Sequence, residues 1–162
     1  MRNALILVGL ALALGVPSAI VLQKERVLAA GTPVLLELAP VDPRSLIQGD
    51  YMRLDYALTR QLADSARRWP RSGEIVVARD ARGVGRFVRR RADGAPLAPG
   101  ELLLPYRRGT NDLRIGTDAY HFQEGDAPLY AAARYGELRV GPSGASVLAG
   151  LRDSAGRVLG ER

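Results

Sequence analysis

Acidic side chains are the residues of this chain with the clearest capacity for acid–base chemistry. A pair of carboxylates hydrolyses a glycosidic bond when one carboxyl is protonated and the other is ionised. The candidates for such a pair are Asp42, Asp50, Asp55, Asp118, Glu124 and Asp126, of which Asp42, Asp50, Asp118 and Glu124 are the leading ones. The chain also has 22 arginines and a single lysine, so ion pairing and turn formation explain such carboxylates as well. We favour that structural explanation and keep the envelope hydrolase as the alternative hypothesis.

The chain has few side chains suited to nucleophilic catalysis or to metal binding. The absence of cysteine excludes thiol nucleophiles, zinc–thiolate sites and iron–sulfur ligation. Ser45 would need a desolvated lysine beside it, but Lys24 follows an apolar segment and is explained as its polar flank. His121 is the only histidine, which disfavours His-based metal sites. We therefore expect no metal and no cofactor, and we favour binding over catalysis.

Two loop segments carry the residue types expected of a binding surface. In the first, residues 40–56, two prolines restrict the backbone around Asp42, and Gly49 permits a positive φ at the start of a strand. The second, residues 120–125, alternates aromatic side chains on one face and ends in an acid–glycine pair. Turn formation alone would also explain both segments.

The segment GDYMRLDY, residues 49–56, resembles the signature of a bacterial family named GDYXXLXY, and all five fixed positions match. The resemblance extends to an N-terminal apolar helix, to residues 42–44 and 120–125, and to the strand at 133–140. The family has no established function. It implies a small membrane-anchored protein whose partner is a multi-pass membrane protein, because such proteins are often encoded beside family members. The matching positions, taken as candidate binding residues, are Asp42, Arg44, Gly49, Asp50, Tyr51, Leu54, Tyr56, Glu124 and Gly125.

An uncharged N-terminal segment would hold these motifs at a membrane. The run Ala4–Leu22 has 19 residues without a charge, and as a helix it would span about 28 Å, the thickness of the hydrocarbon core. A signal peptide cut before Ala19 is the alternative, disfavoured because apolar residues continue to Leu22. We predict an anchor over residues 1–26 in a bacterial inner membrane, with the following domain on the extracytoplasmic side.

Residues 27–162 predict a single β-rich domain. Short strands separated by glycine and proline turns indicate an antiparallel sandwich or a partly open barrel. We predict a half-buried strand over Asp50–Leu58, a last strand over Arg157–Leu159, and short helices over Thr59–Trp69 and Asp126–Arg134. The predicted fold class is therefore mainly β, with one or two short helices.

The net charge of +6 comes from the middle of the chain. Between Arg60 and Arg108 there are 12 basic and 5 acidic residues. A solvated face explains this excess, and contact with anionic lipid or with an acidic partner is the alternative. The segment has few aromatic residues and no nucleic-acid-binding motif, so we expect no nucleic acid. Our leading hypothesis is an anchored module that binds a membrane-protein partner or an envelope component; the oligomeric state is not predicted.

Overall fold

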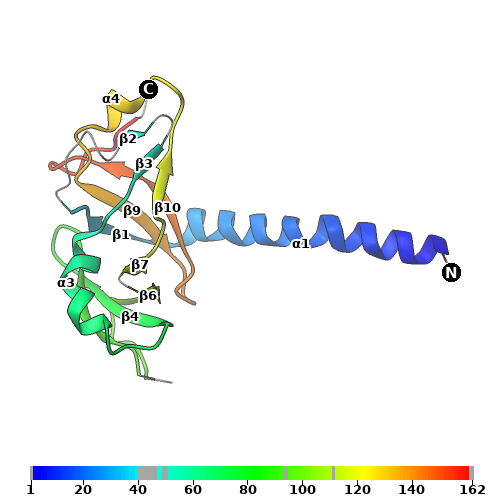
Figure 1. Ribbon diagram of the computed structural model, residues 1–162, viewed down its shortest axis with the longest axis horizontal. Helices are drawn as coiled ribbons and strands as arrows, with labels where there is room; N and C mark the ends of the chain where they lie inside the picture. The colour runs from blue at the N-terminus through cyan, green and yellow to red at the C-terminus, as the bar shows by residue number, and fades with distance from the viewer. Residues whose placement is uncertain (1, 40–46, 49–50, 93–94, 111, 161–162) are drawn as a thin grey trace.

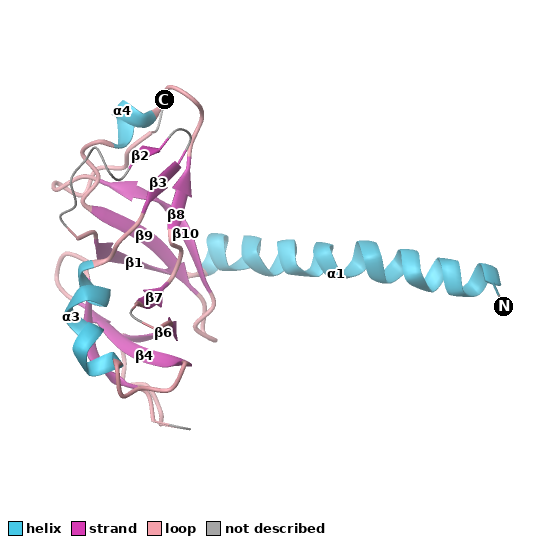
Figure 2. Cartoon of the chain, in the orientation of Figure 1, coloured by secondary structure: helices cyan, strands magenta, loops and turns pink. Residues whose placement is uncertain are grey.

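The computed structural model consists of one long N-terminal helix that projects from a β-rich domain (Figure 1). The structure describes residues 2–39, 47–48, 51–92, 95–110 and 112–160, without the side chains of 2–5, 7–8 and 47–48. The long helix, α1, spans Arg2–Ala30. Two shorter helices, α3 (Ala57–Ala66) and α4 (Ala127–Tyr130), lie near opposite ends of the domain (Figure 2).

The described strands form three antiparallel sheets. Their bounds are β1 (Thr32–Glu37), β2 (Ile47–Gln48), β3 (Tyr51–Arg53), β4 (Ser72–Arg79), β5 (Gly85–Arg90), β6 (Glu101–Arg108), β7 (Leu113–Ile115), β8 (Ala119–His121), β9 (Tyr135–Val140) and β10 (Ser146–Arg152). The strand orders are β1-β9-β10, β2-β3-β8 and β5-β4-β6-β7. A bridge between Leu35 and Val84 joins the first sheet to the β4–β5 hairpin. The sheets curve around one core as a half-barrel, so the predicted mainly β, antiparallel fold is confirmed.

The core draws one or two apolar side chains from nearly every element. In β4 the consecutive residues Ile75, Val76 and Val77 are all buried, because this strand lies between β5 and β6 and is covered on both faces. Leu104 of β6 and Leu138 of β9 are fully buried as well. A single hydrophobic cluster therefore holds the three sheets together.

The predicted strand over Asp50–Leu58 is wrong in its length. Strand β3 ends at Arg53, and α3 begins at Ala57. The side chains of Met52, Leu54, Tyr56 and Leu58 are nevertheless all buried. Alternation describes this segment only as far as Tyr56. Leu58 instead begins the four-residue spacing of Leu58, Leu62 and Ala66 that defines the buried face of α3.

The last predicted strand, near the C-terminus, is not formed as a strand. The predicted strand Arg157–Leu159 is reduced to one bridge, between Arg152 and Val158. The buried Asp153 carboxylate accepts backbone N–H bonds from Ala155 and Arg157, which closes this segment into a turn.

Helix α4 is shorter than predicted. Its N-cap residue Asp126 has helical φ and ψ of −83° and −4° and makes no side-chain capping bond. A capping side chain normally extends from a backbone in the β region, so this residue is not placed to cap the helix.

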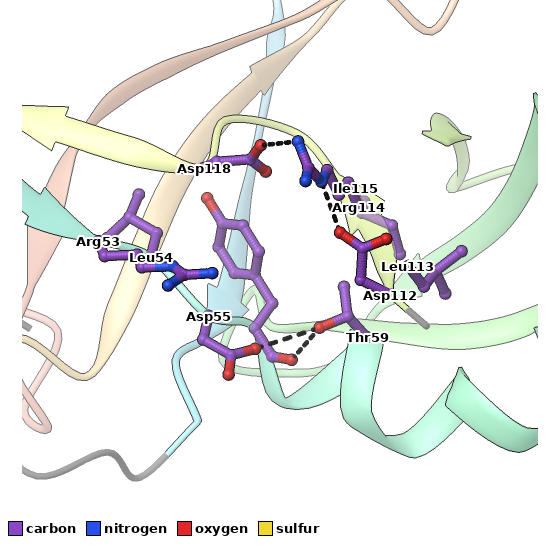
Figure 3. A pocket seen from close by; sticks show the side chains of 10 residues that line it. Arg53, Leu54, Asp55, Thr59, Asp112, Leu113, Arg114, Ile115 and Asp118 are labelled. Carbon is purple, nitrogen blue, oxygen red and sulfur yellow. Dashed lines mark hydrogen bonds and ion pairs between the residues drawn. The ribbon is translucent and has the colours of Figure 1, made fainter. Parts of the chain in front are cut away.

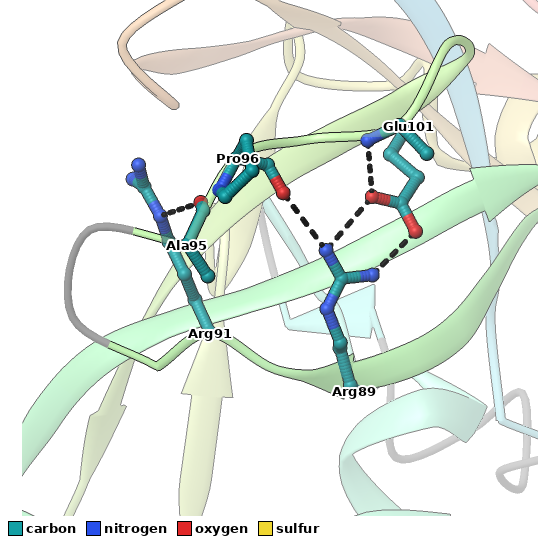
Figure 4. A network of polar contacts seen from close by, with 6 residues as sticks. Arg89, Arg91, Ala95, Pro96 and Glu101 are labelled. Carbon is teal, nitrogen blue, oxygen red and sulfur yellow. Dashed lines mark hydrogen bonds and ion pairs between the residues drawn. The ribbon is translucent and has the colours of Figure 1, made fainter.

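Arginines of the basic segment fasten the loop between β5 and β6. Arg89 forms an ion pair with Glu101, and a second oxygen of that carboxylate accepts a 2.8 Å bond from the Ala98 amide (Figure 4). The hydrogen bond from Arg89 holds the pKa of Glu101 below its ordinary value. Arg91 pairs in the same way with Glu74, at 2.7 Å. Arg89 and Arg91 are therefore engaged within the domain, whereas nine of the twelve arginines between Arg60 and Arg108 are exposed, in keeping with a solvated face.

Helix α1 is fixed to the domain at its C-terminal end. The Gly31 amide donates a 2.8 Å bond to the Val27 carbonyl, and a Cβ at Gly31 would lie 3.1 Å from Arg139. This close approach favours glycine at the end of the helix. Val27 also packs near Gly141, in the turn between β9 and β10. The base of α1 therefore rests on the β9–β10 hairpin, and its N-terminal part extends away from the domain (Figure 1).

Among the residues that the structure describes, no helix combines the length and the apolarity required of a membrane-crossing segment. The predicted run Ala4–Leu22 begins at positions whose side chains lie outside the described set.

Gly136 provides a direct test of core packing. A Cβ added there would lie 3.2 Å from Cε1 of the buried Tyr56 ring, whereas a Cβ at Gly150 of β10 would have no atom within 4 Å. We expect Gly136→Ala to lower the free energy of unfolding by about 1–2 kcal/mol through overpacking. Gly150→Ala should leave it unchanged or raise it by about 0.5 kcal/mol. Chemical unfolding of the full chain in mild detergent, followed by the fluorescence of the single Trp69, measures both. Equal stability of the two variants would contradict this account of Tyr56 packing.

Candidate functional site

The motif segment runs between the end of β1 and the loop before β8. The Leu54 amide donates to the Asp118 carbonyl at 2.8 Å, and the Ala39 amide donates to the Asp55 carbonyl at 2.7 Å. Leu38 and Tyr56 form an antiparallel bridge. Backbone bonds on both sides therefore fix the course of residues 54–56, and with it the directions of their side chains.

Tyr56 is the most deeply placed of the described motif residues, with 2% of its surface exposed. Its hydroxyl donates to the Thr117 carbonyl at 3.2 Å. Burial, and after it the charge of Asp118, raises the pKa of Tyr56 above its ordinary value. The phenol therefore stays protonated and serves as a structural hydrogen-bond donor.

A cleft of about 560 Å³ opens beside Tyr56. Its walls come from the end of the motif, the first turn of α3, and β7 with the loop that follows (Figure 3). The lining residues are Arg53, Leu54, Asp55, Tyr56, Thr59, Asp112, Leu113, Arg114, Ile115 and Asp118. This volume is in the range of small-ligand sites, and it suits a few side chains of a bound polypeptide.

Each carboxylate that lines the cleft is bonded to an arginine. Asp55 accepts bonds of 2.7 and 2.9 Å from Arg60. Arg114 lies between two carboxylates, 2.8 Å from Asp112 and 3.4 Å from Asp118 (Figure 3). The hydrogen bond from Arg114 holds the pKa of Asp112 below its ordinary value. An arginine therefore offsets the negative charge of each of these three carboxylates.

The residues predicted for hydrolysis do not assemble here as a free acid–base pair. Asp118 lines the cleft but is bonded to Arg114. Glu124 is exposed in the turn after β8 and does not line the cleft. Asp42 and Asp50 lie outside the described residues. A general acid needs a raised pKa, and the one shift resolved for a carboxylate of this cleft, that of Asp112, goes the other way.

In the described part of the chain, no three histidine, cysteine, aspartate or glutamate side chains lie together in a way that could hold a metal ion.

Arg53 is a cation of the cleft that has no counterion among the described residues. It is exposed, and its guanidinium makes no ion pair or hydrogen bond with any described residue. Figure 3 shows it on the side of the cleft away from Arg114. Arg53, Asp112 and Arg114 were not among the site residues predicted from the sequence. Arg53 lies 59 positions before Asp112, and no local pattern associates residues so far apart in the sequence.

The two predicted motif segments lie side by side. Strand β3 pairs with β8, which sets Tyr51 opposite His121 and Met52 opposite Tyr120. The rings of Tyr51 and His121 are 5.8 Å apart at their centroids.

At the end of the second segment, Phe122 stacks on Tyr130 of α4, with 5.1 Å between ring centroids. Gly125 has a φ of +89°, the conformation that glycine adopts without strain. Of the other predicted positions, Asp42, Arg44, Gly49 and Asp50 lie outside the described residues, including the positive φ expected at Gly49.

Comparison with protein families gives one match over most of the chain. A family model described as GDYXXLXY protein covers residues 13–151. Searches of curated proteins and of solved structures return no match.

The hydroxyls of Tyr56 and Tyr106 form a matched pair for mutation. The Tyr106 hydroxyl is buried and has no hydrogen-bond partner among the described residues, whereas that of Tyr56 donates to Thr117. We expect Tyr56→Phe to lower the free energy of unfolding by about 1 kcal/mol, because it leaves a carbonyl unpaired. Tyr106→Phe should change it by less than about 0.5 kcal/mol. Unfolding curves of the detergent-solubilised chain measure both changes. A larger loss of unfolding free energy for Tyr106→Phe than for Tyr56→Phe would contradict the structural role of the Tyr56 hydroxyl.

Proposed function

Because this chain belongs to the GDYXXLXY protein family, we propose that it is a membrane-anchored accessory module. In this proposal α1 crosses a bacterial inner membrane and the β domain lies on the extracytoplasmic side. The cleft at Arg53 binds an acidic segment of a membrane-protein partner. The observation that carries the binding proposal is the unpaired cation in a cleft whose carboxylates are all neutralised.

The chemistry of α1 supports the anchor. Eight of its described apolar side chains are more than half exposed: Ile6, Leu10, Leu12, Leu14, Val16, Ile20, Val21 and Leu22. Such side chains on all faces are typical of a helix surrounded by lipid, whereas a helix at a protein surface has one apolar stripe. The hydroxyl of Ser18 donates to the Leu14 carbonyl at 2.7 Å, so this polar group is satisfied within the helix.

The position of the cleft supports a partner in the same membrane. Arg114 and Asp118 line the cleft and also line a second concavity, which extends to Lys24 on α1. Lys24 follows the last residue of the apolar run, Leu22, by two positions. A loop that enters the cleft would therefore start close to the bilayer surface. The alternative ligand is a soluble envelope component, which would have to reach the cleft close to the bilayer surface.

The charges of the cleft favour an acidic ligand. Asp55 is neutralised by Arg60, and Asp112 and Asp118 share Arg114. The guanidinium of Arg53 then gives the cleft a local positive charge. A carboxylate of the partner would meet it in a charge-assisted hydrogen bond, which is stronger than a neutral one.

Leu12→Arg tests the anchor. A charge at the centre of a spanning helix costs about 3 kcal/mol. We expect the wild-type chain to stay with membranes after alkaline extraction and the variant to move substantially into the aqueous fraction. Leu12→Ala, which adds no charge, should behave as the wild type. The mass of the membrane-bound chain distinguishes an anchor from a signal peptide cut before Ala19.

A thiol introduced by Arg82→Cys, in a chain without cysteine, reports the orientation of the domain. It should react in intact spheroplasts with a reagent that does not cross the inner membrane. An intact, uncleaved wild-type chain in the aqueous fraction would overturn the anchor. A thiol that reacts only after lysis would overturn the orientation.

Site-specific photo-crosslinking tests the cleft. Tyr51 is exposed and lies two residues before Arg53 on β3, so both side chains point to the same face. With benzoylphenylalanine at position 51, we expect capture of one membrane protein in native membranes. Arg53→Glu should reduce this capture at least tenfold, because it replaces attraction with repulsion.

Two controls accompany that experiment. Arg82→Glu makes the same charge change at an exposed residue of the β4–β5 turn and should leave capture unchanged. A crosslinker at the exposed Val88 of β5 should not trap the same protein. Capture that is insensitive to Arg53→Glu, or equal from both positions, would count against the cleft as the binding site.

A further inference from the structure

A second concavity, of about 680 Å³, lies where α1 meets the β domain. One side of it is Lys24 of α1, and the other is formed by β4, β6 and the loop between β7 and β8. Its lining residues are Lys24, Ser72, Gly73, Pro105, Tyr106, Arg107, Arg114, Gly116, Thr117, Asp118, Ala145 and Ser146. Asp118 was a candidate for hydrolysis, and Arg107 belongs to the basic segment for which contact with anionic lipid was the alternative.

The concavity carries an excess of positive charge. Lys24 and Arg107 are exposed, and neither side chain makes an ion pair or hydrogen bond with any residue in the described ranges. Arg114 is the third cation and Asp118 is the one acid in the lining, and these two are bonded to each other at 3.4 Å. The two remaining positive charges have no counterion within the described part of the chain.

Strand register brings further donors beside these cations. Arg107 of β6 lies opposite Ser72 of β4 on one side and opposite Arg114 of β7 on the other. The row Ser72, Arg107, Arg114 therefore crosses three neighbouring strands of one sheet. Rigid strands thus present guanidinium and hydroxyl groups together, which is the donor set that recognises a phosphate.

The position of Lys24 identifies where such a group would come from. It lies two residues beyond Leu22, or about 3 Å along the helix axis. With α1 in the bilayer as proposed above, an assumption on which this inference rests, the concavity opens at the level of the lipid headgroups. We propose that it binds the phosphate of an anionic phospholipid headgroup between Lys24 and Arg107.

Lys24 also provides the measurement, because it is the only lysine of the chain. The full chain is inserted into nanodiscs of phosphatidylcholine alone or with one third phosphatidylglycerol. The rate at which an amine-reactive ester acylates Lys24 is read from the mass of its peptide, separately from the N-terminal amine. We expect at least a fivefold slower reaction with phosphatidylglycerol, because the bound phosphate shields the ammonium group.

Two variants of equal charge separate a site from a general surface potential. Arg107→Gln should abolish most of the slowing. Arg82→Gln, in the β4–β5 turn, should retain it. Unchanged Trp69 fluorescence would show that both variants are folded. Equal slowing in the wild type and in both variants would overturn the site, since it would reflect only the charge of the bilayer.

The remaining outcomes distinguish the source of the phosphate and the underlying assumption. Slowing by inorganic phosphate at millimolar concentration in phosphatidylcholine nanodiscs, equal to that by phosphatidylglycerol, would overturn lipid as the source. A chain that inserts into nanodiscs but shows no lipid dependence would overturn this inference and leave the anchor standing. A chain that fails to enter nanodiscs would overturn the anchor itself and this site with it.

Discussion

The Tyr56 side chain is the contact on which the arrangement of the domain depends. Its ring packs against the backbone of Gly136 in the first sheet, and its hydroxyl is bonded to Thr117 in the loop before β8. This side chain, at the junction between β3 and α3, therefore links the first sheet to the loop before β8. This contact also positions two residues that line the cleft, because Asp55 directly precedes Tyr56 and Asp118 directly follows Thr117. Burial makes the contact strong, since the ring and the polar hydroxyl are both satisfied.

Local patterns in the sequence predicted what depends on neighbouring residues. The burial of Met52, Leu54 and Tyr56 agrees with the half-buried strand that was predicted from Asp50 onward. The pairing of β3 with β8 places the two predicted motif segments on adjacent strands. The second wall of the cleft was not predictable, because Arg114 reaches it through the pairing of β6 with β7. That pairing depends on the three-dimensional course of the chain and leaves no periodic signal.

Arginine decides the chemistry of both concavities. A carboxylate beside a guanidinium is held ionised, so it is a poor general acid, and the lowered pKa of Asp112 shows this effect. Figure 3 shows the acids of the cleft facing basic or hydroxyl partners. The chemically available groups are then the cations without a counterion among the described residues, Arg53 in one concavity and Lys24 and Arg107 in the other. Such groups bind anions, which favours recognition over hydrolysis.

Arg114 separates the two concavities and keeps them distinct. Its guanidinium contacts Asp112, in the loop between β6 and β7, and Asp118, in the loop between β7 and β8. Tyr56 contacts this second loop as well, through its hydrogen bond to Thr117. Arg114 and both carboxylates are about half exposed, so each ion pair contributes little by itself, and the two contacts together hold the guanidinium between Asp112 and Asp118. A headgroup phosphate would have to compete with two carboxylates for Arg114, so its binding would come mainly from Lys24 and Arg107. For the same reason a partner carboxylate in the cleft would find Arg53 free and Arg114 already committed.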